Sequence, residues 1–389
     1  MRYSAQLLYS PCNSVIGGRS INSDGLVAGS YSCDFATTRH AFVWDGRIVS
    51  TLPPVPGYPI MFAWGVNSAG DVVGELQPVD GIPTVAFLYA ERVVTSLGTL
   101  PGGNYSRALA INESGLICGQ WGNNVLGNPG THGFVWDGEM HDLILSGGPS
   151  HTANDINARG AVCGWMGYAI WNDSTAYIHQ PDGVTIDLGK PAGAWAAEAK
   201  ALNDVGDACG KKRLALMTGG QPYFALLWSQ GATIELGALP GYTWSDANDL
   251  SNDRVVVGIC VHPSPGFSQS AFVWRDGVMT DLNDLLEPGA GVTVTVANAI
   301  NDAGQITGAG SNAQGDSVAV LLTPVPPLLG DLTCDWEVGA DDLALLLGAW
   351  GACPPSEGWP NVTPCPADLD EDGDVDASDL AILLGNWSV

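Results

Sequence analysis

Short runs of apolar residues alternate with turn sequences along most of the chain. The phrase INESGLICG, from Ile111, has an apolar residue, Asn112, a Gly three residues later and a second apolar run. It recurs in altered form from Ile21, Val66, Ile156, Leu202, Leu250 and Ile300. The seven copies start 45, 45, 45, 46, 48 and 50 residues apart. The chain is therefore a repeat array, and we number repeats 1 to 7 by these copies.

A second phrase falls between successive copies. It reads HAFVWDG from His40 and HGFVWDG from His132, and it recurs from Val85, Ala176, Phe224 and Ala271. Each repeat thus holds four apolar runs, called A before the Asn, B after its Gly, C at the AFVW sequence and D after it. Runs of four to six residues rich in Val, Ile, Phe and Trp favour strands over helices. A four-stranded antiparallel unit predicts the blade of a β-propeller, because such a sheet buries its faces only by stacking on its neighbours.

Runs A, B and C occur seven times, but only six D runs follow them. After the last C run, from Val318, the sequence TPVPPLLG has prolines that exclude a central strand. The N-terminal sequence SAQLLY, Ser4–Tyr9, has the character of a D run. We therefore expect residues 1–322 to form an all-β domain, a seven-bladed β-propeller closed by this N-terminal strand, so that no sheet edge stays open.

The Asn-x-x-Gly phrase predicts a tight turn. The Asn side chain bonds to local backbone groups, and Gly adopts a positive φ without strain. The recurrence of the phrase therefore requires no ligand.

Residues 323–330 predict a proline-rich linker, and residues 331–389 change to loop–helix units. In the second unit, five Asp and one Gly hold positions 1, 3, 5, 6, 9 and 12 of an EF-hand loop: Asp368, Asp370, Asp372, Gly373, Asp376 and Asp379. The carbonyl of Asp374 adds a ligand at position 7. Alternate carboxylates on a tight loop converge on one point, and Ca²⁺ prefers such oxygen ligands. The spacing predicts a calcium site in this second loop.

The first unit keeps part of this pattern. Its candidate ligands, at positions 1, 3, 5, 7 and 12, are Asp331, Thr333, Asp335, Glu337 and Asp342. Trp336 stands at position 6, where the second loop has its Gly. Two interpretations stay open for this loop: a second calcium site, or a structural relic packed by Trp336.

Both loops end in Asp at position 12, and one helix follows each loop. This duplicated arrangement, over about 60 residues, resembles the type I dockerin domain. The resemblance implies calcium-dependent binding of a cohesin-like domain in secreted polysaccharide-degrading systems. The repeats, over roughly residues 1–325, resemble the HAF family of extracellular repeat proteins, named for the motif seen at His40–Phe42. That family implies export and a propeller-like array, with no defined activity.

The formal net charge is −27, and 13 acidic residues with no Lys or Arg lie from Gly330 onward. This charge argues against nucleic acid and anionic membranes as partners, since no basic surface can bind phosphates. No run approaches 18 apolar residues, so we expect no membrane span. No signal peptide is visible at the start of the sequence, so an exported chain would need a signal that this sequence does not show.

The nine cysteines divide into two groups. Cys118, Cys163 and Cys209 occupy one B-run position in successive repeats, which predicts buried thiols too far apart to bridge.

The remaining cysteines include candidates for disulfides. Cys12 and Cys33 flank the first A and B runs, and Cys353 could pair with Cys365 or with Cys334. Such disulfides suit an oxidising location, either extracellular or at the cell surface.

Candidate catalytic chemistry is sparse. The sequence has no nucleophile elbow, no zinc-spaced histidine pair and no phosphate loop. Carboxylates from distant blades could meet at a propeller axis, but nothing singles out a pair among Glu75, Glu113, Asp155, Glu198 and Asp246. Five tryptophans near strand ends either pack between blades or stack on sugars or peptides: Trp64, Trp121, Trp165, Trp195 and Trp244.

The sequence therefore favours a secreted, non-enzymatic binding protein with no catalytic residue assigned. Its propeller would recognise a glycan or peptide, and its Ca²⁺-dependent dockerin-like module would attach it to a cohesin-like partner. The alternative is a glycoside hydrolase that degrades polysaccharide as a component of a cellulosome-like system.

Overall fold

The computed structural model describes residues 2–9, 15–33, 38–78, 83–123, 130–145, 148–168, 173–215, 222–263, 268–326, 328–333, 336–353 and 365–388. Their contacts divide the chain into two units. The larger comprises Ala5–Asp284 and Gly291–Thr323, and the smaller comprises Met1–Ser4, Leu285–Ala290 and Pro324–Val389.

Antiparallel strands follow the four runs of each repeat. The A strands are β2 (Val15–Ile21), β6 (Ile60–Val66), β10 (Tyr105–Ile111), β14 (Ser150–His151) with β15 (Asp155–Ile156), β19 (Ala196–Leu202), β23 (Trp244–Leu250) and β27 (Val292–Ile300). The B strands are β3 (Val27–Tyr31), β7 (Val72–Gln77), β11 (Ile117–Gly122), β16 (Val162–Tyr168), β20 (Ala208–Arg213), β24 (Val256–His262) and β28 (Ile306–Asn312).

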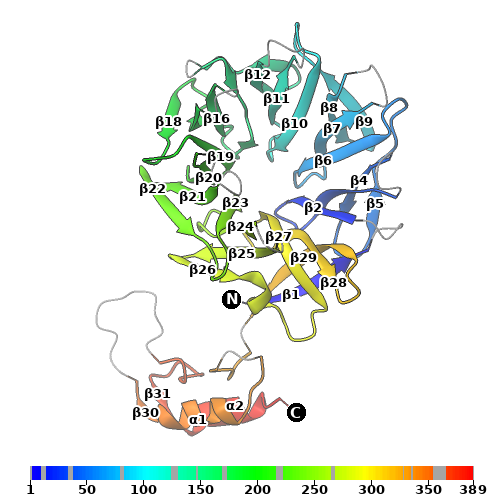
Figure 1. Ribbon diagram of the computed structural model, residues 1–389. Helices are drawn as coiled ribbons and strands as arrows, with labels where there is room; N and C mark the ends of the chain where they lie inside the picture. The colour runs from blue at the N-terminus through cyan, green and yellow to red at the C-terminus, as the bar shows by residue number, and fades with distance from the viewer. Residues whose placement is uncertain are drawn as a thin grey trace. The chain divides into compact units, whose positions relative to one another are not determined.

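The outer strands complete these sheets. The C strands are β4 (His40–Trp44), β8 (Val85–Ala90), β12 (Thr131–Trp136), β17 (Asp173–His179), β21 (Tyr223–Ser229), β25 (Ser268–Arg275) and β29 (Ser317–Val325). The D strands are β5 (Val49–Thr51), β9 (Val93–Gly98), β13 (Met140–Asp142), β18 (Thr185–Gly189), β22 (Ala232–Gly237) and β26 (Val278–Asp281), after which a 3-10 helix spans Leu282–Leu285. Figure 1 shows the sheets set around a common axis, with the A strands innermost.

The sheet of repeat 7 takes its outer strand from the other end of the chain. Its order is β1 (Arg2–Leu8), β29, β28, β27. The A and C strands of neighbouring repeats also touch, and one parallel pair, Ser174 with Ala196, joins repeats 4 and 5 into a nine-stranded sheet.

Strand β29 differs from the sequence prediction, because it continues to Val325 instead of ending before Pro324. The last residue of β29 paired with β28 is Leu322, so Pro324 lies beyond that ladder.

The paired Gly and Phe of the B and C strands explain why the second phrase recurs. Gly74 is the cross-strand partner of Phe87, whose side chain is fully buried. A Cβ built on Gly74 would lie 2.7 Å from Cε1 of Phe87 and 1.8 Å from the main-chain oxygen of Phe62. The same pairing recurs at Gly29 with Phe42, Gly119 with Phe134 and Gly258 with Phe272. Each Phe therefore packs into the core over a position where only Gly fits.

The thiols behave as the repeat register predicts. Cys118, Cys163 and Cys209 are free and buried, and Cys260, which the sequence analysis did not single out, is a fourth buried free thiol. Cys33 is disulfide-bonded, while Cys12 and Cys334 lie outside the described residues.

The tail, residues 331–389, contains two helices, α1 (Ala340–Gly348) and α2 (Ala377–Gly385), one after each acidic loop. Strands β30 (Gly351–Ala352) and β31 (Asp374–Val375) pair, and a disulfide joins Cys353 to Cys365. The tail core is small and consists of Val338, Leu346, Ala367, Val375 and Leu383. No helix in the described part of the chain is long and apolar enough to cross a membrane.

Candidate functional site

The turn asparagines use both ends of their amides. In repeat 3, Oδ1 of Asn112 accepts from the N–H groups of Ser114 and Leu116, which fixes the tight turn. Its Nδ2 donates to the main-chain oxygen of Asn157, in the next repeat, at 2.9 Å. The predicted turn is therefore correct, but the amide has a second role that the sequence analysis missed.

The same inter-repeat bond recurs around the axis and is called the asparagine ladder. Its donors are Asn22, Asn67, Asn112, Asn157, Asn203 and Asn301, each bonded to the main-chain oxygen of the corresponding residue in the next repeat. The bond from Asn301 returns to Asn22, 279 residues away in sequence. Repeat 6 has Ser251 at this position. Its hydroxyl accepts from the N–H of Val255, and among the described contacts it makes no ladder bond to repeat 7.

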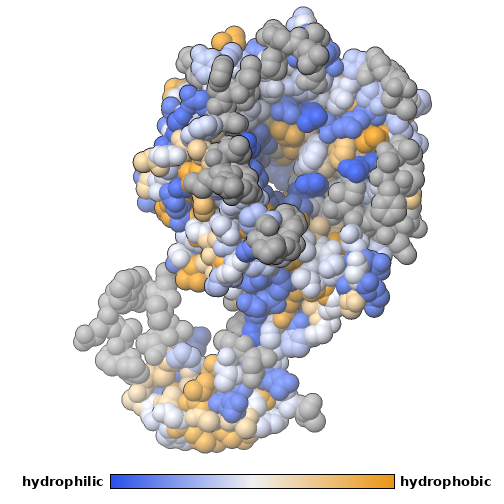
Figure 2. Space-filling view, in the orientation of Figure 1, coloured by the Kyte–Doolittle hydropathy of each residue, from blue (hydrophilic) through white to orange (hydrophobic). Residues whose placement is uncertain are grey.

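A central cavity of about 390 Å³ opens beside this ladder and is lined by the ends of the A strands. Figure 2 shows the hollow at the centre of the ring, with hydrophilic residues around it. Asp155 and Asp249 line it, and each accepts a hydrogen bond from the A strand of the next repeat, at Leu202 and Ile300 respectively. Burial raises the pKa of Asp155 to about 6 and that of Asp249 to about 8.

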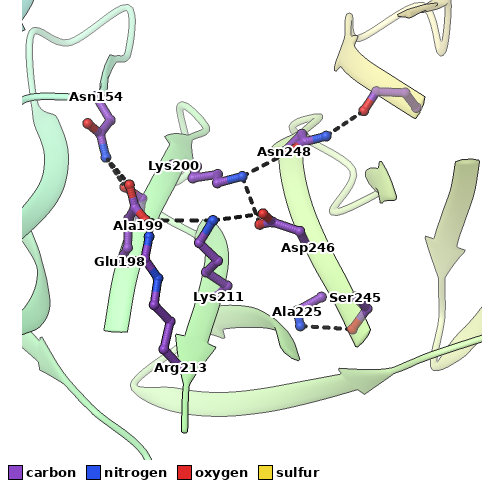
Figure 3. Close-up of polar contacts among 11 residues, drawn as sticks. Asn154, Glu198, Ala199, Lys200, Lys211, Arg213, Ala225, Ser245, Asp246 and Asn248 are labelled. Carbon is purple, nitrogen blue, oxygen red and sulfur yellow. Dashed lines mark hydrogen bonds and ion pairs between the residues drawn. The ribbon is translucent and has the colours of Figure 1, made fainter. Parts of the chain in front are cut away.

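A network of charged side chains links repeats 5 and 6, as Figure 3 shows. Nζ of Lys211 lies 2.8 Å from Oδ2 of Asp246 and 3.9 Å from Oε2 of Glu198. Nζ of Lys200 lies 2.8 Å from Oδ1 of Asp246, and Nη2 of Arg213 lies 3.3 Å from Oε2 of Glu198. Two of the predicted carboxylates, Glu198 and Asp246, therefore share one lysine.

The pKa shifts of Lys211 and Asp246 both favour the charged form. Burial lowers the pKa of Lys211, but the carboxylates of Asp246 and Glu198 outweigh it and leave the pKa above its ordinary value. Burial raises the pKa of Asp246, but Lys200 and Lys211 outweigh it and leave the pKa below its ordinary value. Charged groups that neutralise each other suit ligand recognition better than proton transfer.

The other predicted carboxylates lie apart from this network. Glu75 is buried and its Oε2 lies 2.7 Å from Nε of Arg107. Burial raises the pKa of Glu75, against the attraction of Arg107. Glu113 is exposed and accepts from the N–H and hydroxyl of Ser68. The fold thus brings Glu198 and Asp246 together, but not Glu75 or Glu113.

The five predicted tryptophans have different roles. Trp64 stacks on Phe62 with ring centroids 5.7 Å apart, and Trp121 donates from Nε1 to Oδ1 of Asp142 at 2.8 Å. Trp244 contacts the ring of Tyr223 at 5.2 Å, and Trp195 is 49 % exposed. Trp165 lines a small pocket between repeats 4 and 5. Contacts with other side chains, by packing at Trp64 and Trp244 and by a hydrogen bond at Trp121, thus account for three of the five tryptophans.

In the second acidic loop, Asp368, Asp370 and Asp372 each place a carboxylate oxygen within 4.8 Å of the others. Gly373 has a φ of +98°, as the sharp turn at position 6 requires. The buried Asp379 holds the loop, because its Oδ1 accepts from the N–H of Leu369 and of Asp370.

The remaining ligands predicted for this loop act locally. Asp376 caps α2 by accepting from the N–H of Ser378, and Asp374 donates its N–H to Oδ1 of Asp372. The donor set is all oxygen, and three carboxylates converge, so these residues fit Ca²⁺.

The first acidic loop has the same backbone design. Asp342 accepts from the N–H groups of Thr333 and Gly339, and Asp331 accepts from the N–H of Trp336. Trp336 has a φ of +78°, so it adopts the conformation that Gly373 adopts in the second loop. Asp335 lies outside the described residues, and Glu337 is exposed at position 7. Position 6 therefore keeps its positive φ although its glycine is replaced by Trp336.

The two halves of the tail contact each other reciprocally. Position 8 of the first loop, Val338, exchanges hydrogen bonds with Ser388, which follows α2. Position 8 of the second loop, Val375, pairs with Gly351, which follows α1. The halves are thus structural duplicates as well as sequence duplicates.

Comparisons with known proteins place the fold. No protein-family model and no curated protein matches the sequence. Among solved structures, the β-propeller domain of the Trilobed protease from Pyrococcus furiosus, which has an open velcro topology, matches with a TM-score of 0.50 and 9 % identity, over 83 % of this chain and 94 % of that one. The repeats form a β-propeller. TolB from Acinetobacter baumannii matches with a TM-score of 0.38 and 11 % identity, over 77 % of this chain and 64 % of TolB.

At such identities the propeller likeness shows the fold alone. The sites must therefore be argued from the residues of this chain. The propeller presents two places with unusual chemistry, the central cavity and the charged network, and the tail presents one, the second acidic loop.

Proposed function

We propose that this protein is a secreted, non-enzymatic binding protein. In this proposal, the propeller has seven blades, is closed by its N-terminal strand and offers a recognition surface. The tail binds Ca²⁺ and attaches the propeller to a protein partner. The observation that carries the proposal is the convergence of Asp368, Asp370 and Asp372 in the second loop of a duplicated tail.

Closure of the ring is supported from two sides. Strand β1 adds to β29, and repeat 7 bonds to repeat 1 through Asn301 and through Asn298, whose Nδ2 donates to the main-chain oxygen of Gly18. A ring with no open edge resists pairing with other chains, which suits a secreted recognition domain.

In the tail, Ca²⁺ would be held by Asp368, Asp370 and Asp372, with Asp374, Asp376 and Asp379 completing the shell. When bound, the cation neutralises carboxylates that otherwise repel one another, and so stabilises the loop. The first loop would hold a second ion more weakly, because a threonine replaces the carboxylate at position 3.

An exposed apolar surface on the helices supports a protein partner for the tail. Corresponding residues of the two halves are exposed: Leu347 and Leu384, and Trp350 and Trp387. Exposed tryptophans and leucines commonly mark a protein interface. With the resemblance to dockerin, this surface makes a cohesin-like domain the proposed partner. The disulfides at Cys33 and Cys353 support an extracellular or cell-surface location.

The alternative, a polysaccharide-degrading glycosidase, requires one protonated carboxyl group and one ionised carboxylate beside the substrate. Glu198 and Asp246 do not suit these roles, because both lie against lysine and Asp246 has a lowered pKa. The binding proposal therefore accounts better for the charged network.

Calcium-dependent capture tests this proposal. The full chain is passed over an immobilised cohesin domain in Ca²⁺ and then in EGTA, beside Asp368→Ala and a control, Asp182→Ala, from an exposed turn of the propeller. We expect retention of the natural chain and the control in Ca²⁺ only, and loss of Asp368→Ala. Retention that is indifferent to EGTA, or absent throughout, would overturn the proposed tether.

A further inference from the structure

We propose that the pocket between repeats 4 and 5 binds one neutral sugar ring of a glycan. The inference rests on the proposed role of the propeller as a recognition surface and names the class of its ligand. The pocket has a volume of about 180 Å³ and is lined by Trp165, Tyr168, Ser174, Ala196, Ala197, Glu198 and Arg213.

Repeat 5 has alanine at the lining position Ala196, where repeats 2, 3 and 6 have the larger Ile60, Tyr105 and Trp244. Ala196 pairs with Arg213 on β20 and forms a parallel bridge with Ser174 of the preceding repeat. The same parallel bridge between neighbouring repeats recurs from Tyr105 to Thr84 and from Ile60 to Arg39. Tyr105 is buried at its position, whereas repeat 5 has only the small side chain of Ala196 there. The small residue leaves room for the pocket at this contact between repeats.

Two aromatic side chains of β16 line this pocket. Trp165, in the middle of the strand, is half-buried, and Tyr168, at its end, is 52 % exposed. The C–H groups on the face of a sugar ring pack well against such apolar ring faces. Trp165, a candidate for stacking from its position in the sequence, is the one of the five tryptophans that lines this pocket.

The pocket is also lined by an ion pair with long contacts, between Glu198 and Arg213. Oε2 of Glu198 lies 3.3 Å from Nη2 of Arg213 and 3.9 Å from Nζ of Lys211, and its Oε1 lies 3.5 Å from Nδ2 of Asn154. Other ion pairs of this propeller are closer, such as the 2.7 Å between Arg107 and Glu75. Because its contacts are long, Glu198 keeps the capacity to accept hydrogen bonds from a ligand.

This polar chemistry selects the ligand. A carboxylate accepts and a guanidinium donates, so together they match neighbouring hydroxyl groups, each of which does both. The opposite charges of Glu198 and Arg213 offset one another, which favours a neutral ligand over an anion. The volume is below the roughly 300 Å³ of sites for drug-sized molecules, so a single ring enters.

Titration calorimetry on the full chain tests the pocket. The neutral probes are cellotriose, xylotriose and mannotriose, and the acidic probe is trigalacturonate. We expect at least one neutral probe to bind and the acidic probe to bind more weakly. Ala196→Tyr, which copies Tyr105 of repeat 3, and Arg213→Gln should each weaken binding by about tenfold or more. Tyr168→Ala, at an exposed position, should also weaken it and tests the pocket if Ala196→Tyr does not fold. Trp121→Ala, on the B strand of repeat 3, is the control and should change affinity less than about twofold.

Three results would overturn the inference: no binding of any neutral probe, tighter binding of trigalacturonate, or binding that survives both Ala196→Tyr and Arg213→Gln. Peptide binding that these variants abolish, measured with an unrelated peptide library, would also overturn it by assigning the pocket to another ligand class. In each case, Ca²⁺-dependent capture on cohesin, measured on the same preparation, separates failure of this pocket from failure of the proposed function.

Discussion

The side-chain amide of Asn22 donates from Nδ2 to the main-chain oxygen of Asn67, 45 residues later in the chain, at 2.9 Å. Each repeat thereby bonds to the next through the same side chain that shapes its turn. The ladder links neighbouring repeats near the axis, where the A strands are closest together.

Replacing Asn112 by Asp separates the two roles of the ladder residues. The carboxylate can still accept from Ser114 and Leu116, but it cannot donate to Asn157. We expect a loss of about 1–3 kcal/mol in the free energy of unfolding, because a buried acceptor loses its donor and faces a negative charge. Urea unfolding measures this loss. A variant as stable as the natural protein would show that the ladder contributes nothing beyond the turn.

The gap at Ser251 allows the opposite experiment. Ser251→Asn should add the bond to the main-chain oxygen of Asn301 and raise the free energy of unfolding by about 0.5–1.5 kcal/mol. The same urea titration measures the gain, and Ser251→Ala is the matched control, expected to give no gain. Destabilisation by Asn would indicate that the backbone of repeat 6 does not present the site as the other repeats do.

The turn and strand pattern was predictable because it depends on local chemistry, and the residues responsible recur from repeat to repeat. Asn112 and Gly115 predict a turn from sequence alone, and the Phe of each AFVW run predicts a buried position. The direction of Nδ2 was not predictable, since it depends on how close the next repeat lies. The same holds for Glu198 and Asp246, because their shared lysine, Lys211, is a neighbour only in three dimensions. Ala196 was visible in the sequence as an unusual residue, because the aligned position in repeats 2, 3 and 6 is Ile60, Tyr105 and Trp244.

Deleting residues 1–10 tests the contribution of β1. The deletion uncovers the edge of β29 and the core around Leu8, which is 5 % exposed and packs in one cluster with Leu321. We expect a loss of several kcal/mol, because apolar burial and a strand ladder disappear together. Thermal unfolding monitored by circular dichroism measures it, and unchanged stability would contradict closure by this strand.

The buried thiols should be inert in the native protein. Burial raises the pKa of Cys118, Cys163 and Cys209 well above the ordinary thiol value, and so suppresses the reactive thiolate. We expect labelling by iodoacetamide only in guanidinium chloride, as read by peptide mass spectrometry. Rapid labelling of all three without denaturant would mean that the B strands are not in this register.

Calcium should bind chiefly through the second loop. Isothermal titration of the full chain should lose its tightest site in Asp368→Ala and keep it in Asp331→Ala, because the first loop lacks a carboxylate at position 3. At about 100 times the dissociation constant, Ca²⁺ should stabilise the tail by about 2.7 kcal/mol. Equal titrations for the natural chain and Asp368→Ala would contradict the site.

Asp249 should make stability fall as pH rises. Its pKa is about 8 in the folded chain, against an ordinary 3.8, so between these values the folded chain holds a proton that the unfolded chain has released. Folding is then favoured at the lower pH, with a slope of up to about 1.4 kcal/mol per pH unit.

The variant Asp249→Asn cannot titrate at this position, so it removes this difference in bound protons between the folded and unfolded chain. Relative to the natural chain, it should gain on the order of 4 kcal/mol between pH 5 and pH 9, because the slope acts over about three pH units below the folded pKa of about 8. Urea unfolding at the two pH values gives the difference, in which titrations common to both proteins cancel. Parallel pH profiles for the two proteins would contradict the raised pKa of Asp249.

Strand β29, which leads into the tail, is paired on both edges, with β1 on one side and β28 on the other. A pull on the chain beyond Val325 therefore acts along a strand held by two ladders at once. The hydrogen bonds of those ladders would be loaded together in shear, and would not open one after another as at a free edge. The chain thus leaves the propeller at a mechanically strong point, where a tether under flow or traction would transmit force to a whole sheet.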